Sequence, residues 1–407
     1  MEKKVEQYDV VIIGGGAAGL TAGIYCGRAR LKTLLIEKSL VGGLATYTNE
    51  IENYPGFPEG SSGLELMNLF QKQAKRFGVK FKLTDVQGVS LEGETKVVKT
   101  FRTDYHAKVV IAASGGKPRL TGAKGEDEFL YDKGISFCAT CDAASNTDKT
   151  VLVIGSGDAA IEEGMFLTKF AKEVVVSVMH DEGKMDCNEI ARNEALNNPK
   201  MRFVWNTVVE EFKGSERLET VALKNLKTGD IIDVPVDSCF LFIGYLPNTE
   251  MFKEQLEMNR AGYLISNERM ETNIPGVFAA GDVRDKFLKQ VATAVGDGAI
   301  AGYSAEKYIA ETEVFHNQIL GGEKAKVIYV YNAVDPGCRD LLAVLEEVEQ
   351  RGGGKVDVVR IDTYKSNGLA RRLGVDETPC ALIMRGGKRI KELSCEGLCC
   401  DAILESV

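Results

Sequence analysis

Residues 8–19 read YDVVIIGGGAAG, an apolar run that leads directly into a cluster of glycines. The run is continuous rather than alternating, which is typical of a parallel strand buried on both faces. Gly14, Gly16 and Gly19 form G-x-G-x-x-G where a helix of small residues begins. This spacing lets the backbone approach a pyrophosphate, whose charge is met by the helix N-terminus. Glu37 ends the next apolar run, where its carboxylate can accept hydrogen bonds from a ribose. The stretch predicts a βαβ unit that binds a dinucleotide.

The same order of elements returns in the second third of the chain. The apolar run TVLVI precedes GSGDAA, in which Gly155, Gly157 and Ala160 hold the three turn positions, and the run EVVVSVM follows. Two such openings predict an α/β fold with two doubly wound dinucleotide-binding-type domains. The stretches ASGGKPR (113–119) and IGYLPNT (243–249) are the expected crossings between them. The first domain is split in sequence and is expected to contain residues 1–116 and 246–315, with the second domain at 117–245 between them. A linker is expected at 316–324 and a third domain at 325–407.

Composition narrows the classes of partner. The chain of 407 residues has a formal net charge of -9 and no marked Lys/Arg cluster, which argues against nucleic acid or an anionic membrane surface. No apolar run approaches the roughly 20 residues of a membrane span. The N-terminal apolar run is also too short for a signal peptide. We therefore expect a cytoplasmic protein, whose ten cysteines serve catalysis or metals more often than structural disulfides.

The stretch SFCATCD contains Cys138 and Cys141, with Asp142 directly behind them. This spacing suits a zinc site, a structural disulfide or a redox-active dithiol. Zinc usually needs four ligands, and no second CxxC or His pair is near in sequence, so we predict no metal. A disulfide closing so short a loop would add little stability. Redox cycling is the remaining use, because a thiolate in this spacing is nucleophilic near neutral pH and Asp142 can protonate a departing thiolate. Three tail thiols leave a composite zinc site open, namely Cys395, Cys399 and Cys400.

Four stretches together resemble the low-molecular-weight, bacterial-type thioredoxin reductases: VVIIGGGAAGLTAGIYCGRA, GGLATYTNEIENYPGF, CATCD and GVFAAGDVRDKFLKQVATAVGDGAIAG. They stand in that family's order over residues 6–310. The resemblance implies a homodimer that reduces thioredoxin or another protein disulfide, with FAD as the first dinucleotide. It implies that Cys141 faces the flavin and that Cys138 attacks the substrate. The implied FAD-binding residues are Gly14, Gly16, Ala17, Ala18, Gly19, Glu37, Gly43, Leu44, Asn53, Gly281, Asp282, Gln290, Val291 and Ala292.

The second domain departs from that family. The family binds NADPH through His-Arg-Arg-x-x-x-Arg, whereas this sequence has Val-Met-His at 178–180 and Lys184, with Asp181 and Glu182 between them. A hydrogen bond to a charged group is worth about 1.5–3 kcal/mol, so two lost arginines cost roughly 3–6 kcal/mol, on the order of 10² to 10⁴ in affinity. NADPH is therefore disfavoured, although binding through the remaining His and Lys stays open. NADH is not clearly favoured, since Val178 stands where an acid would bind the ribose. The pattern resembles the ferredoxin-dependent branch, which takes electrons from an iron–sulfur protein, and we expect a ferredoxin-like donor.

Residues 325–407 resemble a thioredoxin-fold domain. YNAVDPGCRDLL lies where that family has Trp-Cys-x-x-Cys, and ETPCALI resembles the segment with the cis-proline, here Pro379. Asp335 replaces the first cysteine, which leaves Cys338 without a CxxC partner. Two interpretations stay open. Cys338 relays electrons with Cys380 or a tail thiol, or the domain serves docking or dimerisation and its cysteines pack as small apolar residues.

These observations predict a flavin-dependent disulfide reductase that passes electrons through the Cys138–Cys141 dithiol to a protein disulfide. Two alternatives remain open at this point. One is a flavin dithiol oxidase that passes electrons to oxygen. The other is a redox-sensing or docking flavoprotein that uses its C-terminal domain to bind a partner.

Overall fold

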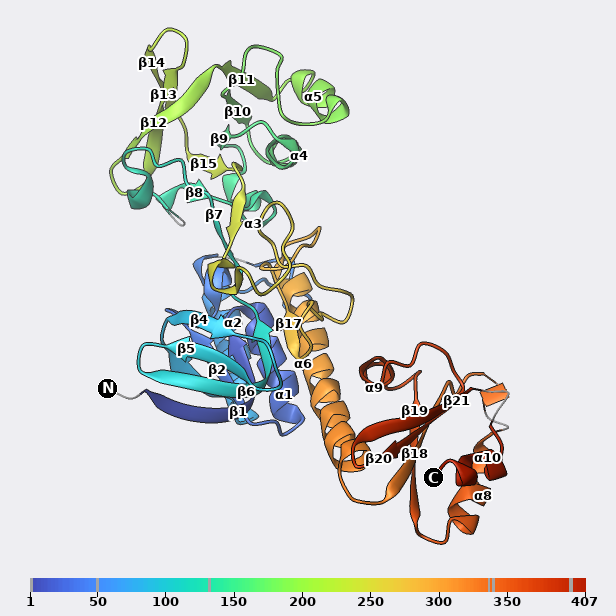
Figure 1. Cartoon of the computed structure of the whole chain (residues 1–407). Coiled ribbons are helices and arrows are strands. Elements are labelled where there is room, and N and C mark those ends of the chain that lie inside the picture. Colours follow the sequence, from blue (N-terminus) through green and yellow to red (C-terminus); the bar gives the residue numbers. More distant parts are fainter. Residues whose placement is uncertain (1–2, 49–50, 131–132, 336, 339–340, 395–397) are drawn as a thin grey trace. The chain divides into compact units, whose positions relative to one another are not determined.

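The computed structural model describes residues 3–48, 51–130, 133–335, 337–338, 341–394 and 398–407 (Figure 1). The chain divides into two units, residues 1–302 and residues 303–407, and the division falls within a long helix, α6 (Val291–Val314). Each unit has its own buried sheet and its own hydrophobic core. The two units are therefore described separately.

The first sheet of the larger unit is seven-stranded, in the order β3-β2-β1-β6-β5-β4, with β17 also paired to β6. Its strands are β1 (Lys4–Ile13), β2 (Thr33–Glu37), β3 (Lys80–Leu83), β4 (Val86–Ser90), β5 (Lys96–Thr100), β6 (Thr103–Ala112) and β17 (Val277–Ala279). Strands β4, β5 and β6 are antiparallel to one another. Strand β3 instead pairs parallel to β2, because α2 (Gly63–Arg76) carries the chain back between them.

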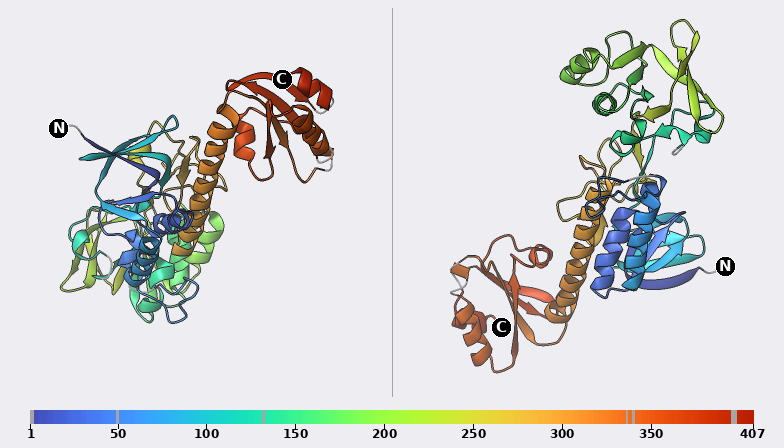
Figure 2. Two further views of the ribbon diagram at one scale, coloured as in Figure 1. Left: turned by 90° about the horizontal axis from the view of Figure 1, so that it is seen from below. Right: turned by 180° about the vertical axis from the view of Figure 1, so that it is seen from behind.

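The continuous apolar run at the start of the chain forms the centre of this sheet. Residues 10–13 of β1 are almost completely buried between the parallel neighbours β2 and β6. Helix α1 (Ala17–Arg28) follows the glycine loop. Helix α6 lies beside α1, where the Cys26 thiol donates to the Gly302 carbonyl at 3.9 Å, and Figure 2 shows these two helices next to each other. The glycine loop is thereby held at the carboxyl end of β1, where doubly wound sheets bind ligands.

The second sheet of this unit is five-stranded and parallel, in the order β11-β10-β9-β15-β8. Its strands are β8 (Ile135–Ser136), β9 (Thr150–Ile154), β10 (Glu173–Val178), β11 (Met201–Trp205) and β15 (Ser238–Leu241). The helices of this part are α3 (Ala139–Asp142), α4 (Asp158–Leu167) and α5 (Glu189–Leu196). The sequence therefore predicts both βαβ openings correctly.

Smaller elements complete the larger unit. An antiparallel sheet contains β12 (Thr207–Gly214), β13 (Leu218–Asn225) and β14 (Ile231–Pro235). The expected crossings contain β7 (Gly116–Pro118) and β16 (Tyr245–Pro247), which pair antiparallel with each other. Short 3₁₀ helices are η1 (Gly43–Tyr47), η2 (Glu126–Glu128), η4 (Ala144–Asn146) and η5 (Glu250–Phe252).

The C-terminal unit contains a four-stranded sheet in the order β19-β18-β20-β21, in which β18 and β19 are parallel and the other pairs antiparallel. Its elements are β18 (Ala325–Tyr331), α8 (Leu342–Arg351), β19 (Val356–Asp362), α9 (Asn367–Arg372), β20 (Cys380–Arg385), β21 (Lys388–Ser394) and α10 (Cys400–Glu405). The Thr378–Pro379 peptide bond is cis.

The predicted linker at 316–324 needs a correction. Its first residues continue α6 as a π-helical turn, η6 (Phe315–Leu320). Ile319 is completely buried and packs with Ile328 and Leu382 in the core of the C-terminal unit. The polar and glycine residues around it suggest an exposed connection, but one apolar side chain in the core holds the turn in place.

Candidate active site

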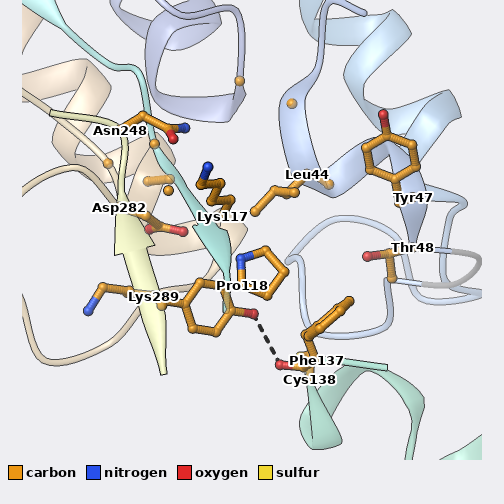
Figure 3. A pocket seen from close by; sticks show the side chains of 18 of the residues that line it. Leu44, Tyr47, Thr48, Lys117, Pro118, Phe137, Cys138, Asn248, Asp282 and Lys289 are labelled. Atoms are coloured by element: carbon orange, nitrogen blue, oxygen red, sulfur yellow. Dashed lines mark hydrogen bonds between the residues drawn. The ribbon is translucent and has the colours of Figure 1, made fainter. Parts of the chain in front are cut away.

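One cavity of about 1630 Å³ in the larger unit brings most of the predicted site residues together (Figure 3). It is lined by the first glycine loop, by the CATC stretch and by the chain around Asp282, and the close-up shows Leu44, Cys138 and Asp282 around the same space. The predicted residues that line it are Gly14, Gly16, Ala17, Ala18, Glu37, Gly43, Leu44, Cys138, Cys141, Asp142, Gly281, Asp282, Gln290 and Val291. Three of the predicted FAD-binding residues do not line it, namely Gly19, Asn53 and Ala292.

The glycine loop owes its shape to close backbone packing. Gly14 has φ +107°, and a Cβ there would lie 2.2 Å from the Ala113 carbonyl oxygen. A Cβ at Gly19 would lie 1.9 Å from the Gly14 carbonyl oxygen, so Gly19 serves the packing of α1 on the loop rather than the cavity wall. Gly16 is different, because its Cβ would meet nothing closer than 3.8 Å. Close packing thus fixes the loop at Gly14 and Gly19, whereas the loop is open at Gly16, where a pyrophosphate can approach the backbone.

The acid at the end of β2 is placed for a ribose. The Gly15 N–H donates to Glu37 Oε2 at 2.7 Å, and the Ser39 N–H donates to Oε1 at 3.0 Å. These bonds orient the carboxylate and leave further lone pairs on both oxygens. At the other wall, burial raises the pKa of the Asp282 carboxyl, and its Oδ1 lies 3.3 Å from Lys286 Nζ. The open loop, the oriented Glu37 and the partly buried Asp282 fit an extended dinucleotide such as FAD.

The dithiol lies at the start of the short helix α3. Cys138 and Cys141 form a disulfide, and Cys138 is the N-cap residue of α3. Ser136 Oγ donates to Asp142 Oδ2 at 2.5 Å and accepts from the Cys138 N–H at 3.2 Å. One hydroxyl thus joins the acid to the backbone of the first cysteine. Asp142 is held beside the dithiol, where it could protonate a departing thiolate.

Gln290 links the CATC stretch to Asn53, and Tyr245 in the second crossing bonds the residue before Cys138. Gln290 Nε2 donates to Thr140 Oγ1 at 3.3 Å, and Asn53 Nδ2 donates to Gln290 Oε1 at 3.2 Å. Asn53 therefore reaches the site through Gln290, although it does not line the cavity. The Tyr245 hydroxyl donates to the Phe137 carbonyl at 3.1 Å, the bond that is dashed in Figure 3. Tyr245 is not among the predicted site residues, because a tyrosine in a crossing strand carries no recognisable signal in the sequence.

Hydrogen bonds join the second glycine loop to the segment that follows β10. Ser156 Oγ donates to Asp186 Oδ2 at 2.9 Å, and His180 Nε2 lies 2.9 Å from the same oxygen. The Asn188 backbone N–H and its Nδ2 both donate to Asp158 Oδ1, at 2.7 and 2.8 Å. The segment from 180 to 188 is thus pinned to the loop that precedes α4. Nothing in the spacing of Asp186 and Asn188 indicates these pairings.

The cations beside this loop are paired with the chain's own acids. His180 hydrogen-bonds Asp186, and this bond lowers the pKa of the Asp186 carboxyl. Asp181 pairs with Lys227, whose hydrogen bond lowers the pKa of the Asp181 carboxyl, and also lies 3.9 Å from Lys184. Val178 at the end of β10 is completely buried, and Met179 is 56% exposed. Where the family places arginines, this structure has a methionine and a histidine already engaged.

The cysteines of the C-terminal unit are mostly buried. Cys338 is completely buried, and its carbonyl accepts a hydrogen bond from the Tyr329 hydroxyl at 2.8 Å. Cys380 is 4% exposed, and burial raises the pKa of its thiol to about 11. Cys400 is also buried, whereas Cys399 is exposed. Cys395 lies outside the described residues. A protonated, buried thiol is a poor nucleophile, so these positions favour packing over electron relay.

Within the described residues, no three His, Cys, Asp or Glu side chains gather closely enough to hold a metal ion. None of the helices in the described part of the chain is long and apolar enough to cross a membrane.

The known proteins that this chain resembles match its larger unit. The family model for pyridine nucleotide-disulphide oxidoreductases matches residues 8–298. The thioredoxin reductase of Peptoclostridium acidaminophilum is 43% identical over 308 residues, which cover 74% of this chain and 97% of that protein. The thioredoxin reductase of Bacillus subtilis (strain 168) is 41% identical over 313 residues, which cover 77% and 97%.

A solved structure agrees with these relatives. The thioredoxin reductase of Streptococcus pyogenes MGAS5005 is 40% identical and superposes with a TM-score of 0.70, covering 75% of this chain and 98% of that chain. The family model ends before residue 303, where the C-terminal unit begins. The likeness to thioredoxin reductases therefore concerns the larger unit.

Proposed function

This chain belongs to the low-molecular-weight thioredoxin reductases, within the pyridine nucleotide-disulphide oxidoreductases, and we propose that it takes its electrons from a ferredoxin-like protein rather than from NADPH. It is a flavin-dependent disulfide oxidoreductase. Thioredoxin reductases act on thioredoxin, so thioredoxin is the first substrate to test, and other protein disulfides are tested next. The observation that carries the donor proposal is the segment after β10, which has no arginine at 179 or 180 and whose Asp186 and Asn188 are hydrogen-bonded to the second glycine loop and to the start of α4.

Different residues of the chain carry out the successive steps of disulfide reduction. FAD, which this family typically binds, would supply the electron pair that opens the Cys138–Cys141 bond. The Cys138 thiolate then attacks the substrate disulfide and forms a mixed disulfide, while the first substrate sulfur leaves and takes a proton from Asp142. Cys141 attacks Cys138 next, which restores the original disulfide and releases the second substrate sulfur. Gly14, Gly16 and Glu37 would hold the cofactor's pyrophosphate and ribose.

Electrostatics supports a donor other than NADPH. A 2′-phosphate brought to residues 178–184 would meet Asp181 and Asp186 next to cations that already have partners. Binding would require breaking these pairs or placing like charges together, and either change weakens affinity. A protein donor that delivers electrons to the flavin needs no such phosphate site.

Three finer features belong to the same proposal. The enzyme forms a homodimer, as the resemblance implies, and works in the reducing cytoplasm, where a dithiol can be regenerated. The C-terminal unit is a thioredoxin-like domain, which is supported by its β19-β18-β20-β21 sheet and by the cis bond before Pro379. It serves docking rather than electron relay, because Cys338 and Cys380 are buried.

The test is anaerobic reduction of the bound flavin, followed by its absorbance, with NADPH, NADH and reduced ferredoxin in parallel. We expect rapid bleaching with reduced ferredoxin and slow or no bleaching with either nucleotide at micromolar concentration. Rapid bleaching by micromolar NADPH would refute the donor proposal. Vigorous peroxide production in air with a dithiol substrate would favour an oxidase instead.

A further inference from the structure

A buried lysine lies behind the wall of the cavity at Asp282. Lys286 does not line the cavity, and its side chain is only 9% exposed. Its Nζ atom lies 3.3 Å from Asp282 Oδ1, and it donates to Asp297 Oδ2 at 3.1 Å and to Thr293 Oγ1 at 3.2 Å. A lysine is rarely buried unless its charge is paired, and here two carboxylates supply the opposite charge.

Asp297 holds this ammonium group in place from α6. Its side chain is 11% exposed, and its Oδ2 accepts hydrogen bonds from Lys286 Nζ and from the Gly281 N–H, the latter at 3.0 Å. Its Oδ1 pairs with Arg284 Nη1 at 3.1 Å. Because Gly281 directly precedes Asp282, the same carboxylate fixes both the turn that presents Asp282 and the ammonium group behind it.

The two oxygens of Asp282 have different surroundings. Oδ1 is shielded from solvent and forms an ion pair with Lys286, with no hydrogen-bond partner among the described residues. The side chain as a whole is 37% exposed and lines the cavity (Figure 3), so Oδ2 is the oxygen that a ligand can reach. An ionised carboxylate only accepts hydrogen bonds, which suits the hydroxyl groups of FAD as donors.

We propose that Lys286 is a positioning residue that holds Asp282 in the ionised, oriented form that accepts hydrogen bonds from the hydroxyl groups of FAD. The inference rests on the proposed FAD site and assigns a role there to a residue outside the cavity wall. Lys286 acts through Asp282, because its ammonium group lies on the inner side of that carboxylate and leaves Oδ2 to the cofactor.

The charged groups around Asp282 act in both directions. Burial raises the pKa of its carboxyl, whereas Lys286 and then Lys289 lower it, and Asp297 raises it. The nearby Tyr263 phenol, whose pKa is raised by burial and then by Asp282, stays neutral near pH 7. Without the charge of Lys286 the effect of burial is less opposed, so the Asp282 carboxyl takes up a proton at a higher pH. Its affinity for hydroxyl donors then weakens as the pH falls.

The experiment measures the FAD affinity of the full-length protein by equilibrium dialysis, with free FAD determined from its fluorescence. The Lys286→Gln substitution removes the charge and keeps an N–H donor for Asp297. Affinity is measured at about pH 8 and about pH 6, a range in which a buried carboxyl can titrate. At the lower pH we expect Lys286→Gln to bind FAD about tenfold more weakly than the unmodified protein, because a hydrogen bond to a neutral acceptor is worth less than one to a charged acceptor. At the higher pH the difference should be smaller.

A double-mutant cycle tests whether Lys286 acts through Asp282. Asp282→Asn removes the carboxylate charge and should weaken FAD binding at both pH values. Adding Lys286→Gln to Asp282→Asn should then cost less than about twofold more, since the pair is already broken. A lysine that only stabilised the fold would cost the same in both backgrounds.

Two controls make the result specific to the charge behind Asp282. Lys286→Arg keeps the positive charge and should follow the unmodified protein at both pH values. Lys108→Gln breaks a 3.0 Å ion pair with Asp9, and neither of these residues lines the cavity. We therefore expect the FAD affinity of Lys108→Gln to equal that of the unmodified protein.

The possible outcomes separate this inference from the proposed function. Equal affinities of Lys286→Gln and the unmodified protein at the lower pH, with folding intact by circular dichroism, would overturn the inference. If Lys286→Gln does not fold, Asp282→Asn tests the same charge, and unmodified affinity in that variant would overturn the inference as well. Failure of the unmodified protein to bind FAD would instead refute the cofactor assignment on which the inference rests. Dialysis needs neither an electron donor nor thioredoxin, so the donor and substrate assignments do not affect this readout.

Discussion

The sharpest test of the donor proposal is to restore a binding site for the 2′-phosphate of NADPH next to the second glycine loop. The double substitution Met179→Arg with His180→Arg restores the two adjacent arginines of the family's motif. Two hydrogen bonds to a charged phosphate at about 1.5–3 kcal/mol each amount to roughly 3–6 kcal/mol, or a gain on the order of 10² to 10⁴ in NADPH affinity. The structure indicates that the double variant falls short of this range.

Asp186 is the reason for the shortfall. Its Oδ2 now pairs with His180 and Ser156, and an arginine at 180 would pair with the same carboxylate instead of a ligand. We therefore expect the double variant to gain about tenfold or less, and the triple variant with Asp186→Ser to reach the full range. Isothermal titration of NADPH against each variant measures the gain.

NADH is the matched control ligand, because it lacks only the 2′-phosphate. Its affinity should change little across the same variants, so that the ratio of the two affinities reports on the phosphate alone. Equal NADPH affinity in the double and triple variants would refute the role given to Asp186. Micromolar NADPH binding by the unmodified protein would refute the whole argument.

Three other substitutions test the fold and the cofactor site. Glu37→Ala removes a charged acceptor at the ribose position and should weaken flavin retention by about 10- to 100-fold, measured by dialysis and absorbance. Gly14→Ala forces a Cβ at φ +107° to within 2.2 Å of a carbonyl oxygen. It should destabilise the larger unit by at least about 1–2 kcal/mol in urea unfolding, and an unchanged midpoint would contradict the loop geometry. Ile319→Ala should cost about 2–5 kcal/mol, because the side chain is completely buried. Asn317→Ala, at an exposed position nearby, should change the free energy of unfolding very little. Equal destabilisation by the two substitutions would favour an exposed linker at 316–324.

Much of the larger unit follows from local patterns in the sequence. The apolar run at residues 10–13, the glycines behind it and Glu37 lie within one βαβ unit, whose geometry is set by strand burial and by the turn that glycine allows. Cys138 and Cys141 are likewise close because they are three residues apart on one turn. Such features depend on neighbours in the chain, so spacing and residue type predict them.

Other features required the folded chain. The parallel pairing of β3, the burial of Ile319 and the burial of Cys338 follow from which distant surfaces pack together. Secondary-structure patterns do not reveal those surfaces.

Around the dithiol and the second glycine loop, too, some features follow from the sequence and others only from the folded chain. The sequence by itself determines that Met179 and His180 replace two arginines and that Asp142 follows the CATC motif. Only the tertiary structure decides that Asp186 engages His180 and that Gln290 bonds Thr140 beside the dithiol. The loss of an arginine is visible at a single sequence position, whereas a hydrogen bond between Gln290 and Thr140 depends on two segments that only folding brings together.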